Sequence, residues 1–148
     1  MERQLPEEPA SEVIRTSDPA ETEAVGARLA SALSPGDVVL VSGELGSGKT
    51  TLIRGATRAL GVSDQVVSPT FTIGRRYRGV VPVSHLDLYR LETLGGEDPA
   101  LLDDYLTEDA VAFLEWPGIA EPEIDRVALR IDIRHEGGDR RSIEIRWG

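Results

Sequence analysis

A glycine-rich segment restricts the possible folds of this chain more than any other feature. Residues Gly43–Thr50 read GELGSGKT, a glycine followed by four residues and then by glycine, lysine and a hydroxyl residue. The apolar run Val38–Val41 before it is typical of a strand buried on both faces, and Lys49–Leu60 after it reads as a helix that Gly61 ends. Glycines let successive backbone N–H groups converge on a phosphate, and a helix start adds its own N–H groups. The segment therefore predicts a phosphate-binding loop between a strand and a helix.

The use of lysine supports this prediction. Of the 16 basic residues, Lys49 is the only lysine, and it stands at the lysine position of the motif. An ammonium is a compact point charge, whereas a guanidinium is a broad fork that does not fit every site. In a phosphate loop the lysine reaches the β- and γ-phosphates and the hydroxyl of the next residue, here Thr50, binds Mg²⁺. The alternative is a glycine turn before an ordinary helix, which leaves the single lysine without explanation.

Length and composition indicate a globular protein of one domain. The chain has 148 residues, 40% of them hydrophobic, and we expect a flexible tail over 1–10 and a single domain over 11–148. There is no cysteine, which excludes disulfides and thiolate metal sites. The net charge of −10 opposes binding to nucleic acid by charge alone. No apolar run is long enough to span a membrane, so we expect a cytoplasmic protein with no membrane contact.

The remaining patterns predict an α/β fold of the P-loop NTPase type. Thr16–Pro19 contains a helix cap and a proline, and predicts a helix that runs to about Leu33. A weak helix is predicted over Pro99–Leu106, and the last two predicted strands form a C-terminal hairpin. Besides Val38–Val41, the predicted short strands are Glu12–Arg15, Val66–Val67, Thr70–Tyr77, Val80–Leu86, Val111–Leu114, Arg126–Arg134 and Arg141–Arg146. The expected architecture is a three-layer sandwich with a largely parallel central sheet and a C-terminal antiparallel extension.

Two carboxylates follow predicted strands directly. Asp87 follows the segment Val81–Leu86, and Glu115 follows Val111–Leu114. The carboxyl ends of parallel strands face the same crevice as the loop that opens the helix, so we expect both carboxylates near the phosphate loop. One would hold Mg²⁺ and the other would polarise a water molecule or couple to it. Each taken singly is also consistent with a surface acid at a strand end.

Several segments together resemble the TsaE (YjeE) family. The matching stretches are Gly43–Thr51, Leu60-Gly61, Ser68–Thr72, His85–Leu91 and Glu115–Pro117, in the order and rough spacing of that family over Thr16 to Pro117. The resemblance implies an ATP-binding and ATP-hydrolysing subunit that acts with the proteins TsaB and TsaD. That complex places a threonylcarbamoyl group on the adenosine at position 37 of tRNAs that read ANN codons. The chain would meet tRNA only indirectly, through the complex.

The resemblance also assigns roles to residues. ATP would be bound by the loop residues Gly43, Gly46, Ser47, Gly48, Lys49, Thr50 and Thr51, with Trp116 beside the nucleotide and Ser17, in the cap region Thr16–Pro19, near the adenine. Thr50 and Glu115 would bind Mg²⁺. Asp87 would act near the γ-phosphate, and Thr70 would be a switch residue, so that Lys49, Asp87, Glu115 and Thr70 form the catalytic set. The chain departs from the family at Gly118, where an acidic residue or glutamine is common.

Two other functions remain open at this point. A small-molecule kinase of the phosphate-loop type would suit the length, and it would need an arginine lid, for which the only cluster is Arg75–Arg78. That cluster precedes the second predicted strand, and it is equally consistent with a solvated hairpin edge. The third candidate is an assembly module gated by nucleotide with negligible turnover, against which the presence of both Asp87 and Glu115 argues.

Overall fold

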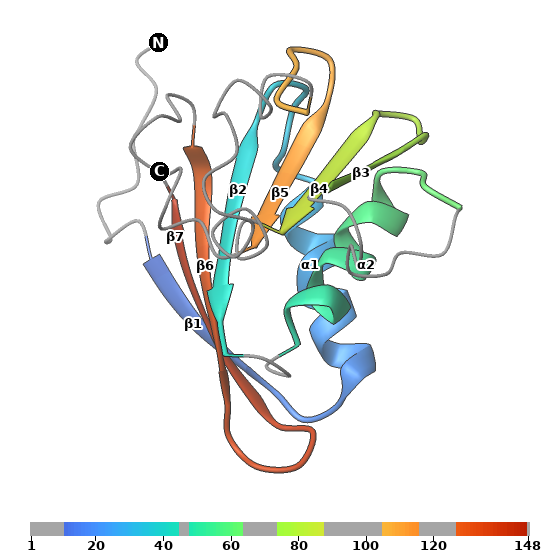
Figure 1. Cartoon of the computed structure of the whole chain (residues 1–148). Helices are drawn as coiled ribbons and strands as arrows, with labels where there is room; N and C mark the ends of the chain where they lie inside the picture. The colour runs from blue at the N-terminus through green and yellow to red at the C-terminus, as the bar shows by residue number, and fades with distance from the viewer. Residues whose placement is uncertain (1–10, 45–47, 64–73, 88–104, 116–126, 148) are drawn as a thin grey trace, which may run out of the picture.

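The chain folds around a mixed β-sheet of seven strands in the order β1-β7-β6-β2-β5-β4-β3 (Figure 1). A computed structural model describes residues 11–44, 48–63, 74–87, 105–115 and 127–147. The elements within these ranges are β1 (Ser11–Thr16), α1 (Pro19–Ala30), β2 (Val38–Gly43), α2 (Lys49–Ala59), β3 (Gly74–Tyr77), β4 (Val83–Asp87), β5 (Val111–Glu115), β6 (Val127–His135) and β7 (Arg141–Trp147). The predicted tail over 1–10, the strand Val66–Val67 and the site residues Gly46, Ser47, Thr70 and Trp116 lie outside the described residues.

Parallel strands occupy the centre of the sheet, as predicted. β6, β2, β5 and β4 run parallel as neighbours, and β2 is buried on both faces. The antiparallel C-terminal extension is also confirmed, because β6 and β7 form a hairpin. Two further predicted strands lie at the edges of the sheet: β1 extends this hairpin by pairing antiparallel with β7, and β3 pairs antiparallel with β4 at the opposite edge.

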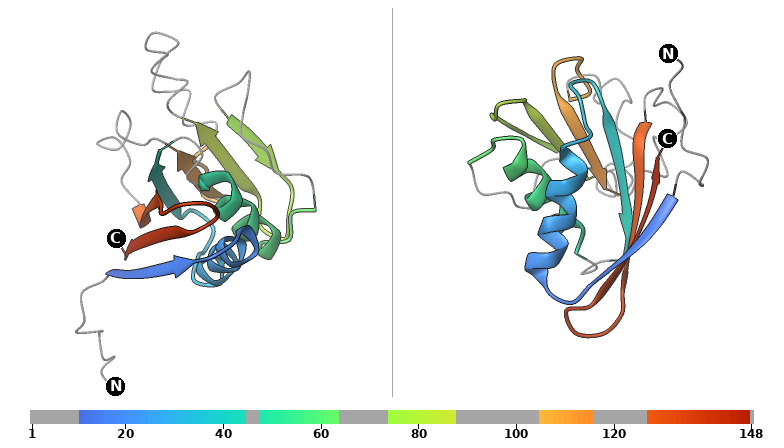
Figure 2. Two further views of the ribbon diagram at one scale, coloured as in Figure 1. Left: turned by 90° about the horizontal axis from the view of Figure 1, so that it is seen from below. Right: turned by 180° about the vertical axis from the view of Figure 1, so that it is seen from behind.

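Both helices of the described segments cover one face of the sheet (Figures 1 and 2). Side chains of α1 and α2, including Leu29 and Leu52, form the main core with Val39, Phe113 and Ile131 from alternating positions of the strands. A smaller cluster lies on the opposite face, where Leu40, Leu86 and Leu114 pack with Tyr105 and Leu106. The third layer of the expected sandwich stays a prediction. Neither helix is long and apolar enough to span a membrane, in the ranges that the structure describes.

Local chemistry explains where α1 begins and ends. Asp18 is the N-cap and accepts a hydrogen bond from the Glu21 N–H at 2.9 Å, and Pro19 follows it, as the cap pattern predicted. The predicted end near Leu33 was wrong, because α1 stops at Ala30. The N–H groups of residues 31–33 donate to carbonyl groups three residues earlier, so the last turn tightens into a 3₁₀ geometry before the proline at position 35.

Two further boundaries differ from the prediction. β4 begins at Val83 rather than Val80, because the N–H groups of Val80 and Val81 donate to the Leu60 carbonyl at the end of α2 instead of to a neighbouring strand. Of the weak helix predicted over Pro99–Leu106, the last two residues form a turn and a bend, and the rest lies outside the described ranges. The end of α2 is as predicted, because Gly61 follows its C-cap with a φ of 90°.

A candidate nucleotide site at the carboxyl edge of the parallel strands

The phosphate-loop motif connects β2 to α2 at the carboxyl edge of the sheet. Gly43 ends β2 with a φ of 152°, and Gly48 is the N-cap of α2 with a φ of 107°. Both values lie in the region that favours glycine, so these two positions of the motif are set by backbone geometry. Gly48 has no side chain that could cap α2, and the positive end of this helix faces the loop. The backbone here suits an anion at the start of α2.

Lys49 is the first residue of α2. Its side chain is 5% exposed, and its Nζ donates hydrogen bonds to the carbonyl oxygens of Gly43 at 2.6 Å and Glu44 at 3.2 Å. Burial lowers the pKa of Lys49, while the negative charges of Glu115 and Asp87 partly oppose that shift. The ammonium group therefore lies within electrostatic reach of both carboxylates that the sequence placed near the loop.

Asp87 and Glu115 are direct neighbours across the sheet. They occupy one register position of the parallel pair β4 and β5, each at the last residue of its strand. Their alternation with Val83 and Phe113 places both on the face that the helices cover. The expectation that the two carboxylates lie together at the strand ends is confirmed. Glu115 is 3% exposed and Asp87 is partly exposed.

A buried histidine completes this group. His85 is 0% exposed, and its Nε2 lies 2.5 Å from Oε2 of Glu115. In the sequence His85 belongs to the stretch His85–Leu91, from which no role for this residue followed. Its position two residues before Asp87 was the available signal, because residues i and i+2 of a strand share one face.

The donors present fit a magnesium ion. Thr50 is the second residue of α2 and partly buried, and Glu115 and Asp87 supply carboxylate oxygens at the same edge of the sheet. No group of three or more His, Cys, Asp or Glu residues within the described ranges could form a metal cage. Mg²⁺ rarely needs one, because it prefers oxygen ligands and is usually held by one or two carboxylates together with water and substrate phosphates. A hydroxyl and a carboxylate beside a phosphate loop match that preference.

Residues from α1 and β7 adjoin the other side of the loop. A small cavity lies among side chains from α1, α2 and the C-terminal hairpin, lined by Pro19, Thr22, Gly48, Thr51, Asp139 and Arg141. The Nε atom of Arg141 stands 3.4 Å from the point where a Cβ on Gly48 would lie. The predicted residue Ser17 immediately precedes the α1 N-cap, on the same side as Pro19. Sequence reasoning missed Arg141, because only the pairing of β7 with β6 brings it to the loop.

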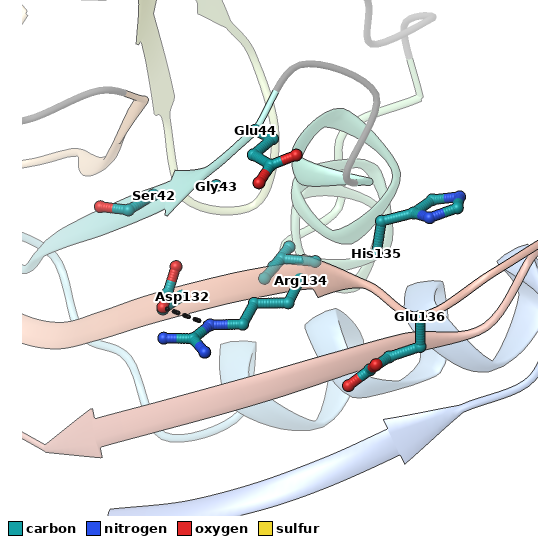
Figure 3. A pocket seen from close by; sticks show the side chains of 8 residues that line it. Ser42, Gly43, Glu44, Asp132, Arg134, His135 and Glu136 are labelled. Atoms are coloured by element: carbon teal, nitrogen blue, oxygen red, sulfur yellow. Dashed lines mark hydrogen bonds and ion pairs between the residues drawn. The ribbon is translucent and has the colours of Figure 1, made fainter.

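A larger cavity lies next to the start of the loop (Figure 3). It has a volume of about 590 Å³ and is lined by Ser42, Gly43 and Glu44 at the end of β2 and by Asp132, Ile133, Arg134, His135 and Glu136. The Nε of Arg134 lies 3.4 Å from Oδ2 of Asp132, so the positive charge of Arg134 is paired with one carboxylate of the cavity. The remaining carboxylates, on Glu44 and Glu136, leave this cavity acidic, so its charge does not suit a triphosphate.

The fold and the site define a mixed α/β protein whose phosphate-loop motif faces two carboxylates across the edge of a parallel sheet. The chain belongs to the TsaE family: the family model described as threonylcarbamoyl adenosine biosynthesis protein TsaE matches residues 16–143. The TsaE protein of Bacillus subtilis (strain 168) is 41% identical over 130 residues, which cover 87% of this chain and 81% of that protein.

A second relative and a solved structure support the same family. The TsaE protein of Streptomyces coelicolor is 44% identical over 113 residues, covering 73% of this chain and 76% of the relative. Each of these relatives is named a tRNA threonylcarbamoyladenosine biosynthesis protein. The crystal structure of Bacillus subtilis YdiB superposes with a TM-score of 0.75 at 36% identity, over 93% of this chain and 86% of that one. The resemblance stated from sequence is therefore confirmed.

Proposed function

We propose that this protein is a magnesium-dependent ATPase that serves the threonylcarbamoyladenosine modification of tRNA together with TsaB and TsaD. The modified residue is the adenosine at position 37 of tRNAs that read ANN codons. The sheet and its helices then form a P-loop NTPase-like three-layer sandwich. Family membership supports the pathway, and the site chemistry supports the ATPase activity.

One observation carries the ATPase proposal. The only lysine of the chain is buried at the start of α2, within electrostatic reach of two carboxylates that end neighbouring parallel strands. An ammonium held by carbonyl oxygens and within electrostatic reach of two carboxylates is a cation placed for an anion that arrives between them. A purely structural lysine at a helix start has no need of this arrangement, because burial of a charge costs free energy.

Each residue of the site has its own role in the binding and hydrolysis of ATP. Lys49 and the amide groups of the loop Gly43–Thr51 bind the phosphates. Thr50 and Glu115 would hold Mg²⁺, which would supply positive charge against the charge of the phosphates. Asp87 stands beside Glu115 and is the more exposed of the two. Asp87 is therefore the carboxylate better placed to contact the attacking water. Thr70 and Trp116 keep their proposed roles as switch residue and nucleotide neighbour.

Phosphate release from ATP, measured with and without TsaB, TsaD and tRNA, tests the proposal. We expect slow release by the protein alone and faster release in the complex. Lys49→Ala is expected to abolish nucleotide binding or hydrolysis. Arg58→Ala is the matched control, since Arg58 lies on the same helix, its side chain is 61% exposed, and it forms an ion pair with Glu23 of α1. Equal nucleotide affinity and turnover in wild type and Lys49→Ala would refute the proposal.

The same assay separates the two alternatives. Phosphoryl transfer to a small acceptor would identify a kinase, and single-turnover hydrolysis near zero in the complete complex would identify an assembly module. No described contact favours the kinase. Arg75 and Arg76 lie on the edge strand β3, and Asp109 is held at a lowered pKa first by a hydrogen bond from Thr107 and to a smaller extent by Arg76. Arg76 therefore lies within electrostatic reach of a carboxylate of this chain.

A further inference from the structure

His85 is the most deeply buried ionisable side chain beside the site. It lies in the middle of β4, opposite Phe113 of β5, on the face that the helices cover. A hydrogen bond between its Nε2 and Oε2 of Glu115 joins two side chains that are 0% and 4% exposed. No part of the proposed hydrolysis uses this histidine. A buried polar ring beside a metal ligand therefore calls for a function of its own.

The unpaired nitrogen of the ring decides where its proton lies. Nδ1 is buried and has no hydrogen-bond partner among the described residues. A neutral imidazole has one N–H donor and one acceptor nitrogen. If the proton were on Nδ1, a buried N–H would be unpaired and the acceptor Nε2 would face a carboxylate oxygen. With the proton on Nε2, the ring donates to Glu115 and leaves only an acceptor lone pair unpaired, which costs less free energy.

This hydrogen bond holds one of the two oxygens of Glu115. Oε2 accepts from His85, so the carboxylate is fixed at one end and Oε1 is left for a cation. The Lys49 ammonium lies within electrostatic reach of Glu115, whose charge partly offsets the lowering of its pKa by burial. A carboxylate fixed in this way has lost most of its rotational freedom before the metal arrives, which lowers the free-energy cost of binding.

We propose that His85 is a positioning residue, which donates through Nε2 to Glu115 and so prepares the Glu115 carboxylate to bind the divalent cation. The identity of that cation rests on the proposed function, whereas the position of the ring proton does not. Partner groups that hold a metal ligand typically change metal affinity 10- to 100-fold when they are removed, so we expect a loss of roughly that size.

The first experiment reads the ring proton directly. The chain has two histidines, so ¹⁵N NMR of histidine-labelled protein without nucleotide gives two ring systems, and His135→Gln assigns them. We expect the Nε2 of His85 to carry a proton. A ring with its proton on Nδ1 and a bare Nε2 would overturn the inference, whatever the protein hydrolyses.

The second experiment compares two substitutions of similar length. His85→Gln keeps an N–H donor near the position of Nε2, and His85→Met removes it while it fills the same space. Mn²⁺ affinity is measured by electron paramagnetic resonance in the presence of a non-hydrolysable ATP analogue, and nucleotide affinity is measured without metal. We expect His85→Met to bind Mn²⁺ about 10- to 100-fold more weakly. His85→Gln should stay within a few-fold of wild type, and metal-free nucleotide affinity should not change.

The outcomes separate the two proposals. Equal Mn²⁺ affinity in His85→Met and wild type overturns the role of His85 and leaves the ATPase proposal intact. Equal losses of Mn²⁺ affinity in His85→Gln and His85→Met would also overturn it. Such a result would indicate a packing role, because only the Gln variant keeps an N–H donor. If wild type shows no metal-dependent nucleotide binding, the proposed function fails and the metal role of His85 fails with it. If His85→Met does not fold, His85→Gln and the NMR spectrum of the ring still test the role of His85. A large loss of Mn²⁺ affinity in His85→Gln would refute that role.

Discussion

A close contact between α1 and α2 allows a quantitative prediction about the helix that begins at Lys49. Gly55 of α2 lies against the backbone of α1, where a Cβ would stand 2.0 Å from the carbonyl oxygen of Glu23. Gly26 of α1 makes the reciprocal contact, at 2.1 Å from the carbonyl oxygen of Leu52. Backbone atoms cannot rotate away as a side chain can. We predict that Gly55→Ala forces the two helices apart and destabilises the protein.

The size of the effect follows from the geometry. Moving the new Cβ from 2.0 Å to the 3.4 Å at which ordinary contact begins requires about 1.4 Å of separation. Overpacking of a close contact costs about 1–3 kcal/mol, and a backbone clash belongs at the upper end. Alanine recovers about 1 kcal/mol through its better helix propensity. The net loss is about 2 kcal/mol, which lowers Tm by roughly 4–8 °C for a chain of this size.

Urea unfolding followed by circular dichroism measures this loss. Ala24→Gly, at an exposed position of α1, is the control, because it reports the effect of helix propensity. The double variant Gly26→Ala with Gly55→Ala should lose less than the sum of the single losses, since one separation of the helices relieves both contacts. A Gly55→Ala protein with a urea midpoint equal to or above that of wild type would refute the reasoning.

Three further predictions concern the site and the start of α1. Burial is the main cause that lowers the pKa of Lys49, so its amine loses its proton at lower pH in the folded protein than in urea. Acylation of Lys49 should therefore begin at lower pH in the folded protein, and MgATP should block it. Equal labelling of the folded protein, the MgATP-bound protein and the protein in urea would contradict the buried location of Lys49. Glu115→Gln should lose metal-dependent phosphate release while metal-free nucleotide affinity stays within a few-fold, and an unchanged Mg²⁺ requirement would remove its role as a ligand. Asp18→Ala should cost about 1 kcal/mol in urea unfolding because the Glu21 N–H loses its acceptor, and no change in the midpoint would argue against this cap.

Most elements of this fold were predictable because their causes are local. An unbroken run of β-branched and aliphatic residues marked β2, and an Asp-Pro pair marked the start of α1. The errors occurred where distant segments compete for a backbone group. The start of β4 was predicted too early, because nothing in Val80 and Val81 reveals that their N–H groups bond to Leu60. Such hydrogen bonds join separate elements, and periodicity contains no information about them.

The sequence by itself determined the chemistry available to this protein: a glycine-lysine-threonine loop between a strand and a helix, two carboxylates at strand ends, one lysine and an acidic net charge. Only the tertiary structure decided which groups meet. Parallel pairing of β4 and β5 brings Asp87 beside Glu115 and places His85 against the Glu115 carboxylate, and the hairpin brings Arg141 to Gly48. The physical reason is that residue type and spacing govern local backbone geometry, whereas strand order and register arise from burial of the whole apolar surface at once.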